Sequence, residues 1–213
     1  MSEILQVANA LLGIDVSHYQ GVIDWVQVAE AGVKFAFIKA TDGESVADQC
    51  LHVNVNGAKA VGIPYGLYHF WRPQYDPMKQ ANNFLRTATS VGAWEFAVAL
   101  DIETGSLSEE NQEDAFAWLA QVDQCIGSKP VKPIVYVSPS YAKYNLTDPA
   151  WIQYPLWAAH YTDLPQPNTD KWPTWMFWQK QGNATIPGIS TAVDVNWFNG
   201  SEEDFQKLIQ LPT

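Results

Sequence analysis

Hydrophobic and polar positions alternate along the chain with two periods, one typical of strands and one typical of helices. Short apolar runs that end at turn residues predict strands, and longer stretches with apolar residues every three or four positions predict helices. Strands are expected at residues 11–17, 34–41, 63–71, 94–103, 133–138, 155–161, 174–179 and 191–197. Helices are expected at 24–31, 47–61, 77–91, 108–126 and 201–210, with a short one after residue 138.

The order of these segments predicts an α/β fold. Strands that alternate with helices favour parallel pairing through right-handed crossovers, and eight strands favour a closed barrel over an open sheet. After about residue 138 the alternation weakens, because the segments between strands become rich in proline, asparagine and glycine. A doubly wound open sheet is the structural alternative, but the chain lacks the glycine-rich phosphate loop of its nucleotide-binding form.

Acidic residues fall where three predicted strands reach the barrel mouth. Successive side chains point to opposite faces of a strand, so Asp101 and Glu103 share the inner face with Ala97 and Ala99. Active groups of such barrels lie at the carboxyl ends of the strands, which places Asp101 and Glu103 together at that mouth. The remaining residues of this segment, Val98, Leu100 and Ile102, are expected to pack under the helices.

The first and last strands repeat the pattern. Asp15 lies opposite Ile14 and Val16 in the alternation, and Asp194 lies opposite Val193 and Val195. The first and eighth strands of a closed barrel are neighbours, so Asp15 and Asp194 are expected side by side at the same mouth. Turn caps, salt bridges or metal binding would each be an alternative use of these carboxylates, but no regular ligand spacing supports a metal.

Four carboxyl groups at one rim favour acid–base chemistry. Like charges at close range push at least one carboxyl toward its protonated form, which a general acid needs. The chain lacks the Gly-x-Ser-x-Gly motif of a nucleophile elbow, so paired acidic residues favour glycoside hydrolysis. Glu103 reaches furthest and is expected to be the acid, with Asp101 as the stabilising or nucleophilic group.

Composition sets limits on size and partners. A chain of 213 residues with 47% hydrophobic residues is expected to form one domain, and its net charge of -11 argues against nucleic acid and anionic membranes as partners. No apolar run approaches the roughly 20 residues of a membrane span, and the N-terminus lacks the pattern of a signal peptide. Cys50 and Cys125 have no metal or redox spacing and are expected to be small buried residues.

Several ordered motifs resemble glycoside hydrolase family 25, the Chalaropsis-type lysozymes common among phage endolysins. They are Gly13–Gly21 followed by Ile23–Trp25, then Phe37–Gly43, Gly66–Phe70, Leu100–Glu103 and Asp194–Asn196, so the resemblance covers nearly the whole chain. It implies an irregular TIM-like barrel, with five β/α units followed by three strands with few helices. It also implies hydrolysis of the β-1,4 bond between N-acetylmuramic acid and N-acetylglucosamine, with Asp15, Asp101, Glu103 and Asp194 in the active site.

The resemblance leaves the role of Asp101 open, since it either attacks the sugar directly or orients the substrate's acetamido group. The Asp-x-Glu spacing favours orientation. Substrate-binding residues are expected at Lys39, Tyr68, Tyr136, Trp157 and Gln179, with Trp157 as a sugar-stacking wall. No metal or other cofactor is expected.

Three alternatives stay open: a family 18 chitinase, a sugar-binding barrel without activity, and a structural virion component. The chitinase is disfavoured because Phe96 and Ala99 occupy positions where its signature carries aspartates. Residues 1–213 are expected to form one catalytic domain without a wall-binding module and to act as a monomer on bacterial peptidoglycan. Release by a holin, virion delivery or specialised secretion is expected, because no signal peptide is seen.

Overall fold

The computed structural model describes residues 10–92, 95–126 and 131–209. Its strands are β1 (Leu11–Val16), β2 (Phe35–Asp42), β3 (Val46–Ala47), β4 (Tyr65–Phe70), β5 (Val98–Asp101), β6 (Ile134–Val137), β7 (Leu156–Ala159), β8 (Phe177–Ala184) and β9 (Val193–Phe198). Its α-helices are α1 (Trp25–Glu30), α2 (Leu51–Ala60), α3 (Pro77–Ser90), α4 (Glu109–Ile126), α5 (Pro139–Asn145) and α6 (Glu202–Ile209). Two 3-10 helices, η1 (His18–Gln20) and η2 (Pro149–Gln153), complete the order.

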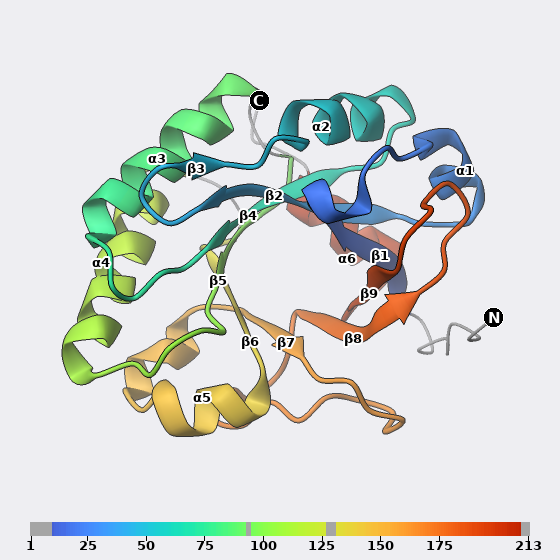
Figure 1. Ribbon diagram of the computed structural model, residues 1–213. Coiled ribbons are helices and arrows are strands. Elements are labelled where there is room, and N and C mark those ends of the chain that lie inside the picture. Colours follow the sequence, from blue (N-terminus) through green and yellow to red (C-terminus); the bar gives the residue numbers. More distant parts are fainter. Residues whose placement is uncertain (1–9, 93–94, 127–130, 210–213) are drawn as a thin grey trace.

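Eight of the strands close into a barrel, which Figure 1 shows from its open mouth. The strand order is β1-β9-β8-β7-β6-β5-β4-β2, and β1 pairs with β2 to close the ring. Five strand–helix units come first, and β7, β8 and β9 follow with no α-helix between them. The expected irregular barrel is therefore confirmed.

Strand direction corrects one expectation. Neighbouring strands are parallel from β1 through β2 and β4 to β8, but β9 runs antiparallel to both β8 and β1. Asp194 therefore reaches the mouth from the beginning of its strand and not from its end. Its register partner on β1 is Asp15, so the expected proximity of the two residues is correct although the strand direction was not.

A short strand replaces the beginning of one predicted helix. The helix expected at 47–61 starts only at Leu51, and β3 (Val46–Ala47) instead pairs with the end of β2. Asn83 on α3 fixes this segment, because its side-chain amide donates to the carbonyls of Gly43 and Val46. Contacts from another helix thus decide the conformation of a stretch whose own pattern resembles a helix.

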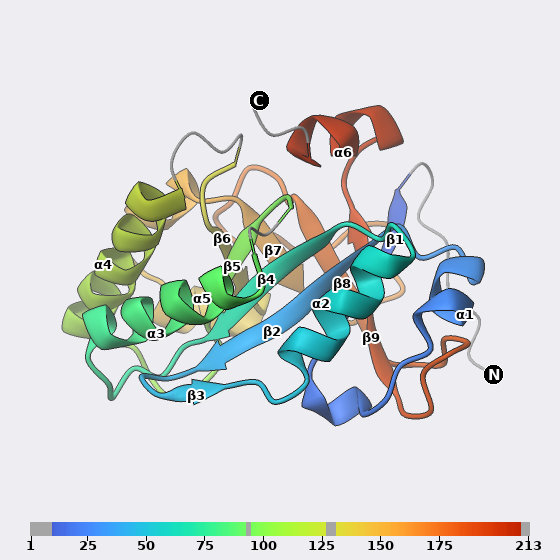
Figure 2. The same cartoon turned by 90° about the horizontal axis from the view of Figure 1, so that it is seen from above.

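Aromatic side chains fill the lower barrel interior. Phe35, Phe37, Phe96, Phe177 and Phe198 pack against one another there, and Phe205 of α6 joins them. An ideal Cβ on Gly13 would lie 2.3 Å from the Phe35 ring, so glycine at this position makes room for that ring. Figure 2 shows α6 across the end of the barrel opposite β3, which closes the bottom and leaves the mouth for function.

The outward faces of the strands form a second core beneath the helices. Ile14, Val16, Val98, Leu100 and Ile102 belong to it, as their alternation predicted. Local signals start the helices: Asp24 accepts from the amides of Val26 and Gln27, and Pro77 occupies the first turn of α3. The interior is thereby left to aromatic side chains below and polar side chains above.

The ends of two predicted segments and the two cysteines differ from what the sequence pattern predicted or cannot be compared with it. Trp94 and Gln210, at the ends of a predicted strand and a predicted helix, lie outside the described residues. Neither cysteine is disulfide-bonded, and Cys125 is exposed rather than buried because it faces outward from the last turn of α4. Among the described residues, no helix combines the length and apolar character needed to cross a membrane.

Candidate active site

A cavity of about 220 Å³ opens at the barrel mouth. Its lining comprises Asp15, Ser17, Tyr19, Lys39, Tyr68, Phe70, Asp101, Glu103, Tyr136, Trp157, Tyr161, Gln179 and Asp194. All nine site residues expected from the sequence lie in this lining, although they come from eight different strands or the segments that follow them. We call this cavity the catalytic pocket.

Backbone pairing positions the two acidic residues of the Asp-x-Glu segment. Asp101 is the last residue of β5, and its carbonyl accepts a hydrogen bond from the amide of Trp71. The amide of the next residue, Ile102, donates to the carbonyl of Tyr136 on β6. The chain therefore stays paired with β6 for one residue after β5 ends. Glu103 therefore stands one step above Asp101, exposed on the rim.

Asp15 and Asp194 form a carboxyl pair on the opposite wall. They hydrogen bond to each other, and Oδ2 of Asp15 also accepts from the side-chain amides of Gln179 (2.9 Å) and Asn196 (2.7 Å). Burial and the nearby charge of Asp15 raise the pKa of Asp194 to about 8. The pair therefore holds one proton near neutrality, carried by Asp194 while Asp15 accepts from the two amides.

Each of those two amides is oriented by an aromatic donor. The Tyr136 hydroxyl donates to Oε1 of Gln179 at 2.8 Å, and the Tyr161 hydroxyl donates to the same oxygen at 2.9 Å. The indole nitrogen of Trp157 donates to Oδ1 of Asn196 at 2.8 Å. With both oxygens occupied by donors, both amide nitrogens must face Asp15, so the network fixes the orientation of the two amides.

The surroundings of Asp101 and Glu103 raise the pKa of both carboxyl groups. Burial raises the pKa of Asp101 well above its ordinary value, and the charge of Glu103 adds to this effect. Burial likewise raises the pKa of Glu103, with a contribution from Asp15, while Lys39 opposes it. Within the described part of the chain, Oδ1 of Asp101 is buried without a hydrogen-bond partner, so it is available to a ligand.

Lys39 supplies positive charge at the pocket edge. Its ammonium lies 3.4 Å from Oδ2 of Asp42 and 4.6 Å from the centroid of the Phe70 ring. Arg72 forms two hydrogen bonds to Asp42, of 2.7 and 2.9 Å, and so shares that carboxylate. Lys39 therefore pairs with Asp42 outside the pocket, which leaves the four pocket carboxyls only partly compensated.

The structure adds four lining residues that the sequence reasoning did not select: Ser17, Tyr19, Phe70 and Tyr161. Three of them belong to motifs that were noticed for other reasons, whereas Tyr161 ends a predicted strand and gave no signal beyond that position. Trp157 lies in the lining but is only 2% exposed, with its ring stacked on Phe37 at 4.1 Å. It therefore forms part of the pocket floor, with little surface for stacking a sugar.

Two histidines near the mouth have structural partners. His69 is buried between the Thr41 hydroxyl (2.7 Å) and Oε1 of Gln80 (3.1 Å), and burial lowers its pKa to about 4. His18 contacts the buried Asp48 at 2.7 Å. Among residues 10–92, 95–126 and 131–209, no group of three or more histidine, cysteine or acidic side chains is arranged to hold a metal ion.

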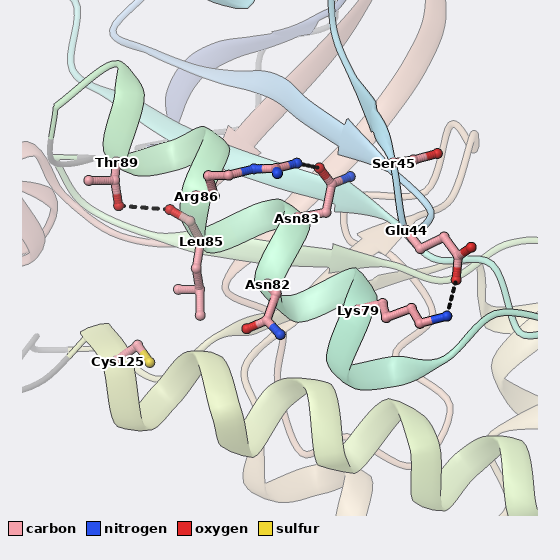
Figure 3. A pocket seen from close by; sticks show the side chains of 9 residues that line it. All are labelled: Glu44, Ser45, Lys79, Asn82, Asn83, Leu85, Arg86, Thr89 and Cys125. Atoms are coloured by element: carbon pink, nitrogen blue, oxygen red, sulfur yellow. Dashed lines mark hydrogen bonds and ion pairs between the residues drawn. The ribbon is translucent and has the colours of Figure 1, made fainter.

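A larger hollow, of about 820 Å³, lies outside the barrel between α3 and the end of α4. Figure 3 shows its side chains, among which Lys79 approaches Glu44 and Arg86 donates to Asn83. These polar groups already pair with one another, and the hollow contains no raised or clustered carboxyls. The barrel mouth is therefore the candidate active site.

A barrel mouth lined by four carboxyl groups with raised pKa values is the arrangement expected of a glycoside hydrolase site. Its one lining serine, Ser17, accepts a hydrogen bond from the amide of Tyr19 and donates to Gln20, so it is used in the local turn. Comparison with known proteins agrees: the profile of Glycosyl hydrolases family 25 matches residues 14–189. The chain belongs to that family, which confirms the resemblance expected from its motifs.

Relatives and solved structures are similar over most of their length. The chain is 36% identical to protein YegX of Escherichia coli O157:H7, covering 92% of this chain and 72% of that protein. It is 33% identical to lysozyme M1 of Streptomyces globisporus, covering 91% and 69%. The crystal structure of a bacterial lysozyme from Streptomyces coelicolor superposes with a TM-score of 0.79 at 29% identity, covering 95% and 98%.

Proposed function

We propose that this glycoside hydrolase is a lysozyme that cuts the β-1,4 bond between N-acetylmuramic acid and N-acetylglucosamine in bacterial peptidoglycan. The observation that carries the proposal is the set of four carboxyl groups around one pocket, whose pKa values are all raised, with burial as the largest cause. The similarity to lysozyme M1 supports the choice of peptidoglycan as substrate.

Glu103 is the general acid in this proposal. Burial raises its pKa, which favours the protonated form that a general acid needs, and its exposed position lets the proton reach a bound glycosidic oxygen. Protonation of that oxygen releases the N-acetylglucosamine end while positive charge develops on the muramic acid ring. After the leaving sugar departs, the ionised Glu103 accepts a proton from the water that completes hydrolysis.

Asp101 orients the substrate's 2-acetamido group. Its unpartnered Oδ1 is suited to a hydrogen bond with the acetamido N–H, which would direct the acetamido oxygen at the anomeric carbon. Asp15, held in place by Gln179 and Asn196, supplies negative charge toward the developing cation, and Asp194 keeps the shared proton. Lys39, Tyr68, Tyr136, Trp157 and Gln179 bind the sugar or hold these groups in place.

The oligomeric state, the partners and the route to the substrate also belong to the proposed function. It acts as a monomer on the glycan strands of the wall, without nucleic acid, membrane insertion or a cofactor. Delivery through a holin, a virion or a specialised secretion system would bring it to that substrate. The acidic character of the chain, with a net charge of -11, supports the exclusion of nucleic acid.

Product analysis tests the bond specificity and the acetamido role together. Purified peptidoglycan is digested, the new reducing ends are reduced with borohydride, and the soluble fragments are identified by mass spectrometry. Reduced muramic acid ends are expected from native strands, and no products are expected from strands whose acetamido groups have been removed. Reduced glucosamine ends would contradict the bond specificity, and a trapped glycosyl–Asp101 adduct would contradict the orienting role.

A further inference from the structure

Besides the catalytic pocket and the hollow between α3 and α4, a third space of about 460 Å³ adjoins the catalytic pocket. Its lining comprises Tyr161, Thr162, Asp163, Lys180, Gln181, Gly182 and Asn183. Tyr161 lines both spaces, so the two adjoin at this side chain. We call this space the side hollow. Because it adjoins the reacting centre, whatever occupies it would be attached to, or next to, the sugar in the catalytic pocket.

An irregular strand builds the floor of the side hollow. The register of β8 on β9 shifts between Gln179 and Gln181 and again between Gln181 and Ala184. Such bulges re-aim side chains and are frequent beside active sites. A Cβ on Gly182 would lie 2.7 Å from the Tyr161 hydroxyl and 3.0 Å from Oδ1 of Asp194, so glycine allows the bulged strand to approach both groups.

Tyr161 is anchored at one end and open at the other. Its hydroxyl lies within hydrogen-bonding distance of both Gln179 and Asp194 and can donate its one proton to either of them, while 60% of the residue remains exposed. A ring held in place by its hydroxyl costs little conformational entropy when a ligand packs against its face. Trp157, at 2% exposure, offers no comparable face, so Tyr161 is the aromatic surface that the mouth presents on this side.

The remaining lining suits a neutral ligand rich in hydroxyl groups. Gln181 and Asn183 carry amides that both donate and accept, Thr162 adds a hydroxyl, and Asp163 and Lys180 bring opposite charges. An aromatic wall flanked by mixed donors and acceptors matches the apolar ring faces and polar edges of a hexosamine. The balanced charge gives no preference for an anionic peptide.

From these observations we infer that the side hollow is a sugar subsite, in which Tyr161 is the wall against which the neighbouring hexosamine of the glycan strand packs. The inference rests on the proposed function, because the ligand is the next sugar of the same strand. Tyr161 then has two separable roles: its hydroxyl positions Gln179 and Asp194, and its ring binds sugar. Tyr161→Phe removes the first role and keeps the second, whereas Tyr161→Leu removes both.

Binding to inactive protein tests the ring. In a Glu103→Gln background, the dissociation constant is measured for soluble glycan strands whose peptides have been removed by an amidase. Tyr161→Phe is expected to bind within about twofold of the parent, and Tyr161→Leu to bind about threefold to tenfold more weakly. Asn183→Ala is expected to weaken binding in the same direction. The matched control is Tyr144→Leu, which removes an exposed tyrosine of α5 that lines neither the side hollow nor the catalytic pocket.

Kinetics of the active enzyme test the hydroxyl. Tyr161→Phe is expected to lower kcat and alter the pH profile with KM nearly unchanged, and Tyr161→Leu to raise KM as well. Equal strand affinity for the parent, Tyr161→Leu and Asn183→Ala would overturn the subsite. A loss of affinity seen only with peptide-bearing strands would also overturn it, by assigning the hollow to the peptide. Failure of the parent enzyme to release muramic acid ends would instead refute the proposed function, because strand binding is measured separately.

Discussion

Asp194 illustrates how strongly individual residues are shifted by their surroundings in this pocket. Its pKa rises to about 8 because the carboxyl is desolvated and lies beside Asp15, whose oxygen already accepts two amide hydrogen bonds. In an unfolded chain the same group has a pKa near 3.8. The folded state therefore binds a proton that the unfolded state has lost, so Asp194 makes the protein less stable as pH rises from about 4 to about 8.

Asp194→Asn removes that pH-dependent cost. Asparagine keeps a donor for Asp15 without a titrating proton, so the variant is expected to exceed the parent in stability by about 1–3 kcal/mol at pH 8, with the difference vanishing near pH 4. Thermal unfolding at several pH values measures this difference, with Glu113→Gln on the surface of α4 as the control. A difference that does not change with pH would show that the raised pKa is wrong.

The inward or outward direction of a side chain was predictable where it depends only on alternation along a single strand. Alternation alone placed Asp101 and Glu103 on the inner face, and the same rule separated Asp15 from Ile14. Tyr161 was not predictable as a partner of Asp194, because that contact depends on the bulge at Gly182 and on a strand distant in sequence. The role of Trp157 was also misjudged, since exposure is decided by packing against Phe37 rather than by residue type.

At the scale of elements, packing overrides local preference in α2. Gly57 lies within this helix, where alanine would ordinarily stabilise by about 1 kcal/mol. An ideal Cβ on Gly57 would lie 2.1 Å from Cδ1 of Trp25, whose side chain is only 5% exposed. Overpacking of this kind costs about 1–3 kcal/mol, so the steric effect outweighs the gain in helix propensity.

Gly57→Ala is accordingly expected to lower stability by about 1–2 kcal/mol. The urea midpoint measures the change. In a Trp25→Leu background the clash is removed, and the same substitution is expected to stabilise the protein. A higher midpoint for Gly57→Ala with Trp25 intact would mean that the ring moves aside freely and that packing does not control this helix.

Element boundaries show the same division between local and distant causes. The helix at 77–90 was predictable because Asp76 and Pro77 begin it through its own sequence. The β3 segment was not, since Asn83 holds it from a separate helix. Nor could the direction of β9 be read from its pattern, because an inward-facing Asp194 and Asn196 look the same in a parallel and an antiparallel strand.

For the whole molecule, one end of the barrel is built for stability and the other for chemistry. Phenylalanines and α6 fill the lower end, so the polar network at the mouth rests on a rigid floor. The closed ring brings residues from β1 and β9 together although 179 positions separate Asp15 from Asp194 (194 − 15). Sequence pattern predicted this closure through the count of strands, and the family membership of the chain agrees with it.

Loss of peptidoglycan hydrolysis on replacing Glu103 is the most direct test of the account. Initial rates of product release are compared for the parent, Glu103→Gln and Glu113→Gln, each checked for an unchanged thermal midpoint. The account predicts a loss of about 10²–10⁴-fold for Glu103→Gln, as expected for removal of a general acid, and a rate within about twofold of the parent for Glu113→Gln. A Glu103→Gln protein that is folded and retains the parent's rate would contradict the assignment of the acid.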